Sequence, residues 1–263
     1  MKLNYKFYPF QNSNQEKKSI GDFIILHGLF GSSKNWVTVS KFLSEFGNVY
    51  AIDQRNHGDS PHNKQHSIQL MADDLDELIK YLQIETPILL GHSMGGLVAM
   101  YFDLTHPGVL KKLIIQDIAP RAYPFSYDNE IKSMSFPLEG FASRSEIDTE
   151  MAKYVKDSFI RQFLQMSLER REDGVYQWKL NVAGLNQARR VFDDAFIFEK
   201  TSDTKTLFLL GGISEYIKES DIELMDRFFK ANEKKTIAGG GHYIHFTHQK
   251  EYLEILKDWL ERN

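Results

Sequence analysis

The sequence predicts an α/β fold in which helices cover both faces of a mostly parallel central sheet. Short apolar runs alternate along the chain with longer segments whose apolar residues recur at helical spacing, an alternation typical of parallel sheets. Several of the short runs, such as residues 22–28 and 205–212, are apolar nearly throughout, as strands buried on both faces are. The 263 residues, 42% of them hydrophobic, suffice for one large domain or for a core domain with an insertion.

The expected elements follow one another in a regular order. Residues 2–9 alternate polar and apolar side chains, which indicates a half-exposed strand. The other expected strands are residues 22–28, 48–53, 87–93, 111–118, 205–212 and 234–240. Helical spacing of apolar residues predicts helices over residues 34–46, 67–83, 94–107 and 248–263.

One region, residues 120–204, interrupts this alternation. It contains no convincing strand, and residues 141–173 and 185–200 have a helical character. A helical stretch between two core strands predicts a cap over the sheet, so we expect a core of residues 1–119 and 205–263 and a helical cap of residues 120–204. The alternative is that this region simply continues the same domain.

Composition and charge limit the classes of function. The formal net charge of −4 argues against a general affinity for nucleic acid or for anionic membranes. The absence of cysteine excludes disulfides, thiolate metal sites and a cysteine nucleophile. The polar N-terminal segment lacks the apolar stretch of a signal peptide, and no window approaches the ~18 apolar residues of a membrane span. We therefore expect a soluble, cytoplasmic protein; the sequence leaves its oligomeric state unknown.

The strongest functional signal is the segment GHSMGG, which places Ser93 in a G-x-S-x-G pattern between an expected strand and an expected helix. Glycines on both flanks let the backbone pass closely around a strained serine, and the helix that follows points its first amides at the same place. The alternative is a chance glycine-rich turn. In the context of strand and helix, the pattern predicts a nucleophile.

A serine nucleophile needs an adjacent base, and His242 stands on a glycine-rich turn after the last expected strand. His242, His245 and His248 also form H-x-x-H-x-x-H, but this spacing starts in a turn and ends in a helix, so we expect no metal site. The carboxylate that orients the base has two candidates. Asp117 ends an expected strand and is favoured, and Glu215, in a loop, is the alternative acid.

Acyl transfer also requires two backbone amides for the developing oxyanion. The amide of Met94 follows the nucleophile directly, and the amide of Leu29 lies in the glycine-containing segment HGLFGS. The side chains expected to line the substrate pocket are Phe30, Tyr123, Phe125 and Tyr243. In the polar loop DQRNHGDS, Arg55 and His57 are expected to tie loops together by hydrogen bonds rather than to contact substrate.

Five motifs in this order, HGLFGS, DQRNHGDS, GHSMGG, THPGVLKKLIIQDIAP and GGGHYIHF, resemble the α/β-hydrolase superfamily over nearly the whole chain. RNHGDS, QDIAP, YQWKLN and GGISEYI are similar to the small bacterial serine esterases related to mitochondrial abhydrolase-domain proteins. The resemblance implies an α/β-hydrolase fold with a helical cap inserted after the sixth strand. Most of the superfamily carries its acid in a turn where this chain has Ser214, whereas the esterase branch carries it at the position of Asp117.

The resemblance also implies hydrolysis of small-molecule carboxylic esters without any cofactor. Acyl-CoA thioesters are a second substrate class that it implies. We therefore expect a serine carboxylesterase that uses Ser93, His242 and Asp117. Two alternatives remain because fold does not fix function. One is a lyase or carbon–carbon bond hydrolase of the menaquinone-pathway type, and the other is a non-catalytic ligand-binding protein of the same fold.

Overall fold

The computed structural model describes residues 1–11, 18–193 and 200–262, and its centre is a seven-stranded sheet in the order β1-β3-β2-β4-β5-β8-β9. The strands are β1 (Asn4–Tyr8), β2 (Phe23–Leu26), β3 (Val49–Asp53), β4 (Ile88–His92), β5 (Lys112–Gln116), β8 (Thr206–Gly211) and β9 (Asn232–Ile237). Only β1 runs antiparallel to its neighbour in this sheet. The mostly parallel sheet predicted from the sequence is thereby confirmed.

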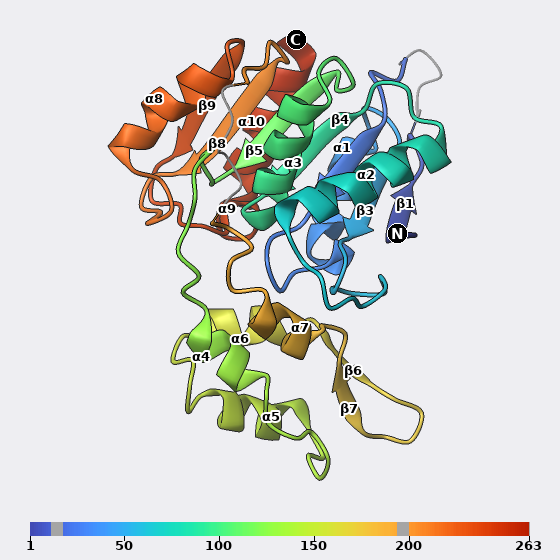
Figure 1. Ribbon diagram of the computed structural model, residues 1–263, viewed down its shortest axis with the longest axis vertical. Coiled ribbons are helices and arrows are strands. Elements are labelled where there is room, and N and C mark those ends of the chain that lie inside the picture. Colours follow the sequence, from blue (N-terminus) through green and yellow to red (C-terminus); the bar gives the residue numbers. More distant parts are fainter. Residues whose placement is uncertain (12–17, 194–199, 263) are drawn as a thin grey trace.

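Helices pack on both faces of the sheet because successive apolar residues of the central strands point to opposite sides. Ile24 and Leu89 belong to one buried cluster, whereas Ile25 and Leu90 belong to the other. The first cluster is covered by α2 (Ile68–Leu82), α3 (Met94–Thr105) and α8 (Glu219–Phe228), and the second by η1 (Ser33–Trp36), α1 (Val37–Leu43) and α10 (Gln249–Arg262). Figure 1 shows α2 and α3 across the near face of the sheet.

The segment between β5 and β8 forms a separate group of elements beyond one end of the sheet (Figure 1). These elements are α4 (Asp128–Ser133), α5 (Arg144–Met151), α6 (Ser158–Gln165), β6 (Leu168–Arg170), β7 (Tyr176–Trp178) and α7 (Val182–Gln187). Ser143 and Asp157 cap the first turns of α5 and α6 with their side chains. Residues 194–199 of the predicted cap lie outside the described residues.

Two expectations about this segment are corrected. It follows the fifth strand of the chain rather than the sixth, because five strands precede it. It is also not all helical, because β6 and β7 form an antiparallel hairpin. The physical reason lies in Asp173-Gly174, a tight-turn dipeptide in which Gly174 has a φ of 84° that glycine adopts without strain.

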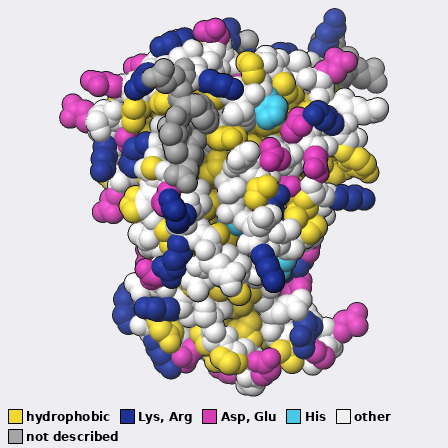
Figure 2. All heavy atoms as spheres, viewed as in Figure 1, with side chains coloured by type: hydrophobic (Ala, Val, Ile, Leu, Met, Phe, Trp, Pro, Cys, Tyr) yellow, Lys and Arg dark blue, Asp and Glu magenta, His cyan; other side chains and the backbone are white. Residues whose placement is uncertain are grey.

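The distribution of charged side chains on the surface and the apolar character of the helices agree with the composition of the chain. On the face shown in Figure 2, basic and acidic side chains are interspersed, in keeping with the small net charge of −4. Among the described residues, no helix has both the length and the apolar character needed to span a membrane.

Gly95 sets how closely α3 approaches β2. A Cβ atom at this position would lie 2.4 Å from the Leu26 carbonyl oxygen and 2.6 Å from the His27 carbonyl oxygen. We expect Gly95→Ala to lower the free energy of unfolding by roughly 1–3 kcal/mol, because the backbone must shift to relieve the overlap. Urea unfolding measures the loss. Gly241→Ala, whose added Cβ would meet no atom within 4 Å, is the matched control; equal midpoints for both variants would contradict the prediction.

Candidate active site

Ser93 stands at the sharp corner between β4 and α3. Its φ of 52° and ψ of −118° lie in a region that residues with a side chain rarely adopt. The corner is possible because a Cβ atom at Gly91 would lie 2.3 Å from the Gly95 carbonyl oxygen, so only glycine fits there. This strand, corner and helix have the geometry of a nucleophile elbow.

Asp117 follows β5 and is fully buried, with a φ of 52°. Its Oδ2 lies 2.7 Å from His242 Nδ1, and its Oδ1 accepts a hydrogen bond of 2.8 Å from the amide of Gly211. The hydroxyl of Ser214 donates a second hydrogen bond to Oδ2. The residue that stands where most of the superfamily has its acid therefore supports the carboxylate of Asp117.

Glu215, the alternative acid, lies elsewhere. Its side chain is exposed and lines a separate surface pocket together with Arg121 and Tyr123. The structure therefore brings Asp117, and not Glu215, to the imidazole of His242.

The main chain of His242 is also held. Its carbonyl oxygen lies 3.1 Å from His92 Nε2 and 3.3 Å from Gln116 Nε2. His92 is neutral, because burial lowers its pKa well below the usual value, and in this state one ring nitrogen can donate to the carbonyl. Both the ring and the backbone of His242 are thus fixed by residues at the ends of β4 and β5.

Ser93 and His242 both line a cavity of about 160 Å³. In the described part of the chain, no hydrogen bond joins the Ser93 hydroxyl to the imidazole. Such bonds are often long in unliganded enzymes and tighten only when substrate binds. The cavity therefore brings together the serine and the histidine that the sequence selected.

The loop of residues 28–31 passes directly over Ser93. A Cβ atom at Gly28 would lie 3.2 Å from Ser93 Cβ, so a side chain larger than glycine's would crowd Ser93. The Phe30 amide donates a hydrogen bond of 3.1 Å to His57 Nε2. Across the described residues, the amides of Leu29 and Met94 donate to no acceptor of the protein, which leaves both for an oxygen in the cavity.

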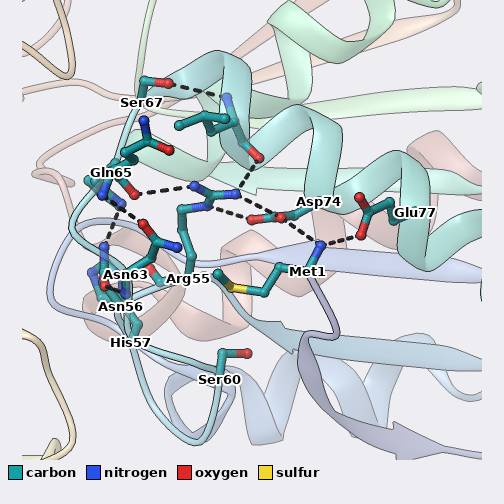
Figure 3. A network of polar contacts seen from close by, with 12 residues as sticks. Met1, Arg55, Asn56, His57, Ser60, Asn63, Gln65, Ser67, Asp74 and Glu77 are labelled. Atoms are coloured by element: carbon teal, nitrogen blue, oxygen red, sulfur yellow. Dashed lines mark hydrogen bonds and ion pairs between the residues drawn. The ribbon is translucent and has the colours of Figure 1, made fainter.

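The loop after β3 is held by a network of polar contacts around Arg55 (Figure 3). Arg55 binds Asp74 of α2 through two nitrogens, at 2.6 and 2.8 Å, and donates further hydrogen bonds to the carbonyls of Gln65 and Leu70. His57 of the same loop contacts the Phe30 amide. The expectation that Arg55 and His57 tie loops together is confirmed.

Tyrosines form one wall of the cavity. The Tyr216 ring stacks on the His242 ring with a centroid separation of 3.8 Å and an interplanar angle of 16°. The Tyr216 hydroxyl lies 2.9 Å from the Tyr127 hydroxyl, which comes from the cap. Burial raises the pKa of both phenols, so both stay neutral near pH 7.

The predicted pocket residues divide into two pairs. Phe30 and Tyr243 line the cavity. Tyr123 and Phe125 do not: the Tyr123 hydroxyl bonds the Ala119 amide and the Tyr216 carbonyl, and the Phe125 ring stacks on Phe192. Both act in packing the cap.

Other cavity residues were not singled out from the sequence. They are Glu130, Ile160, Phe163, Leu164 and Tyr216. The spacing of the three apolar ones in α6 was a readable signal, because residues three and four apart share one helix face. Nothing in the sequence marked Glu130 or Tyr216.

His245, the second histidine of the segment H-x-x-H-x-x-H, has a structural role. His245 stacks on Trp36 at 4.4 Å, and its Nδ1 lies 2.7 Å from Gln116 Nε2. Burial lowers the pKa of His245 to about 3, so the ring is neutral. No group of three or more histidine, aspartate or glutamate side chains is arranged to hold a metal ion within residues 1–11, 18–193 and 200–262.

Comparison with known proteins agrees with this fold. Residues 23–249 match the family model of the α/β-hydrolase fold, and the chain belongs to that family. It is 31% identical over 249 residues to the mouse sn-1-specific diacylglycerol lipase ABHD11, covering 90% of this chain and 80% of that protein. It is 29% identical to Escherichia coli esterase YbfF over 99% of both chains.

A solved structure of a marine microorganism esterase superposes with a TM-score of 0.89 at 34% identity, covering 97% of this chain and 98% of that one. The fold class and the relation to abhydrolase-domain proteins expected from the sequence are confirmed. The protein is a hydrolase of the carboxylesterase type.

The Arg55–Asp74 pair generates a stability prediction. Asp74→Ala leaves a buried guanidinium without its carboxylate, so we expect a loss of roughly 3–5 kcal/mol in the free energy of unfolding. Asp76→Ala, on the same helix, removes only an exposed ion pair with Lys80 and should cost about 0.5 kcal/mol at most. Chemical denaturation of both variants measures the difference, and similar losses would show that the buried pair does not brace the loop.

Proposed function

We propose that the protein hydrolyses small-molecule carboxylic esters through an acyl-enzyme formed on Ser93, with His242 as base and Asp117 as the acid that orients it. The observation that carries the proposal is the 2.7 Å contact between Asp117 and His242 Nδ1 beside the cavity that Ser93 also lines. A carboxylate on Nδ1 leaves Nε2 unprotonated in the neutral ring, which is the state a base requires.

The steps follow from this arrangement. Ser93 Oγ attacks the acyl carbonyl while His242 Nε2 takes its proton, and Asp117 stabilises the imidazolium that forms. The amides of Leu29 and Met94 bind the negative oxygen of the tetrahedral intermediate. The alcohol leaves with the proton from His242, and a water molecule then attacks the acyl-enzyme by the same route.

The substrate class follows from the cavity and from residues 120–204, which contribute to its lining. We propose that residues 1–119 and 205–263 act as the core and residues 120–204 as a cap that selects substrate. Ile160, Phe163 and Leu164 offer an apolar wall for the acyl chain. Thioesters present the same carbonyl to Ser93 and belong to the proposed class, and a panel of butyrate esters and acyl-CoAs compares the two.

Substitution of the three proposed catalytic residues tests the mechanism. We expect Ser93→Ala or His242→Ala to lower kcat by about 10⁶, and Asp117→Asn to lower it by up to about 10⁴ because the imidazole loses its orientation. Glu215→Gln is the control and should leave kcat unchanged. Initial rates on a p-nitrophenyl ester, with fluorophosphonate labelling of Ser93, measure both effects. A mild effect of Asp117→Asn beside an inactive Glu215→Gln would overturn the assignment.

Tyr216 should stabilise the imidazolium through its ring face. A cation over an aromatic ring gains up to about 2 kcal/mol when desolvated, which corresponds to about 30-fold in rate. We therefore expect Tyr216→Leu to lower kcat by up to that factor. Tyr216→Phe keeps the ring and should lose little. If both variants lose activity equally, the hydroxyl contact with Tyr127 matters instead of the stack.

A further inference from the structure

One carboxylate lines the cavity but has no part in the proposed hydrolysis. Glu130, from α4 of the cap, shares the cavity with Ser93 and His242. Its charge contributes to the raised pKa values of Tyr127, Tyr216 and Tyr243, which line the same cavity. Among the described residues that line this cavity, Glu130 is the one carboxylate.

Among the residues that the structure describes, no cation pairs with the carboxylate of Glu130. Within the described residues it forms no ion pair and receives no side-chain hydrogen bond, whereas its neighbour Asp128 pairs with Arg189. Burial raises the pKa of Glu130, the charge of Asp128 adds to the rise, and the backbone amide of Glu130 itself opposes it. A partly desolvated carboxylate without a partner is costly, and such groups concentrate at functional sites.

We infer that Glu130 is a substrate-binding residue that accepts an electropositive group, a hydroxyl proton or an ammonium, in the alcohol portion of the ester. The inference rests on the proposed ester hydrolysis at Ser93. The same carboxylate repels esters whose alcohol portion carries a negative charge.

The layout of the cavity assigns Glu130 to the alcohol portion. Ile160, Phe163 and Leu164 of α6 offer apolar surface that suits the acyl chain, which leaves the polar groups of the same cavity for the alcohol portion. Ser93 and Glu130 line the same cavity of about 160 Å³, so an ester whose carbonyl reaches Ser93 shares this cavity with the carboxylate. A buried hydrogen bond to a charged acceptor changes binding by about 10- to 100-fold.

Matched butyrate esters test the inference in the full-length protein. Propyl butyrate and 2-hydroxyethyl butyrate differ only by a methyl or a hydroxyl at the end of the alcohol. Choline butyrate and 3,3-dimethylbutyl butyrate differ by a positive charge at nearly constant shape, and 3-butyryloxypropanoate carries a negative charge. The measurement is kcat/KM for each ester with the wild type, with Glu130→Gln, and with Asp128→Asn as an exposed control on the same helix.

We expect the wild type to favour the hydroxyl or the cationic ester over its uncharged partner by about 10-fold or more, and to discriminate against the anion. In Glu130→Gln these ratios should fall toward one, whereas Asp128→Asn should keep the wild-type ratios. A preference within the first pair identifies a hydroxyl as the recognised group, and a preference within the second pair identifies a cation.

Two results would overturn the inference alone. One is identical ratios in the wild type and in Glu130→Gln, and the other is an equal loss of Glu130→Gln activity on all five esters. Failure of the wild type to hydrolyse any ester, together with absence of fluorophosphonate labelling at Ser93, would overturn the proposed function and the inference with it.

Discussion

The site depends on the hydrogen bonds that the buried carboxylate of Asp117 accepts. It receives hydrogen bonds from the amide of Gly211 at the end of β8, from Ser214 in the following loop and from the imidazole of His242 after β9. Groups at or beyond the ends of three neighbouring strands, β5, β8 and β9, therefore come together around one charge. Because each of these groups offers a proton to it, the carboxylate stays satisfied without solvent. Replacement of the usual acid by Ser214 is consistent with this arrangement, since a second carboxylate so close would repel the first.

The sheet itself holds the strained residues in place. The Ser93 amide bonds the Gln116 carbonyl at 3.1 Å, and the Asp117 amide bonds the Leu209 carbonyl at 2.9 Å. These bonds continue the parallel ladder one step beyond the strands, into residues whose φ is 52° in both cases. Backbone strain of this kind costs roughly 1–3 kcal/mol for each residue and persists only where the surroundings over-determine the geometry. Here the ladder and the glycines around Ser93 supply that constraint.

The sequence revealed those parts of the site whose geometry is set locally. Ser93 and Asp117 lie at strand ends, and the strands could be recognised from short apolar runs, so their meeting at one edge followed from the parallel order. The cap was harder, because the positions of Tyr127 and Glu130 depend on how its helices sit over the core. The hairpin of β6 and β7 was missed although Asp173-Gly174 signals a tight turn. Aromatic composition alone also failed to separate Tyr243, in the cavity, from Tyr123, in the packing.

Tyr216 couples the cap to the proposed base. Its ring stacks on His242, and its carbonyl accepts hydrogen bonds from the Arg121 guanidinium and the Tyr123 hydroxyl at the start of the cap. Arg121 in turn pairs with the buried Asp221 of α8 at 2.8 Å. The first residues of the cap are therefore anchored to the same loop that supports the imidazole. The Tyr216 hydroxyl also lies 2.9 Å from the Tyr127 hydroxyl, so the proposed substrate pocket and the proposed base share one set of contacts.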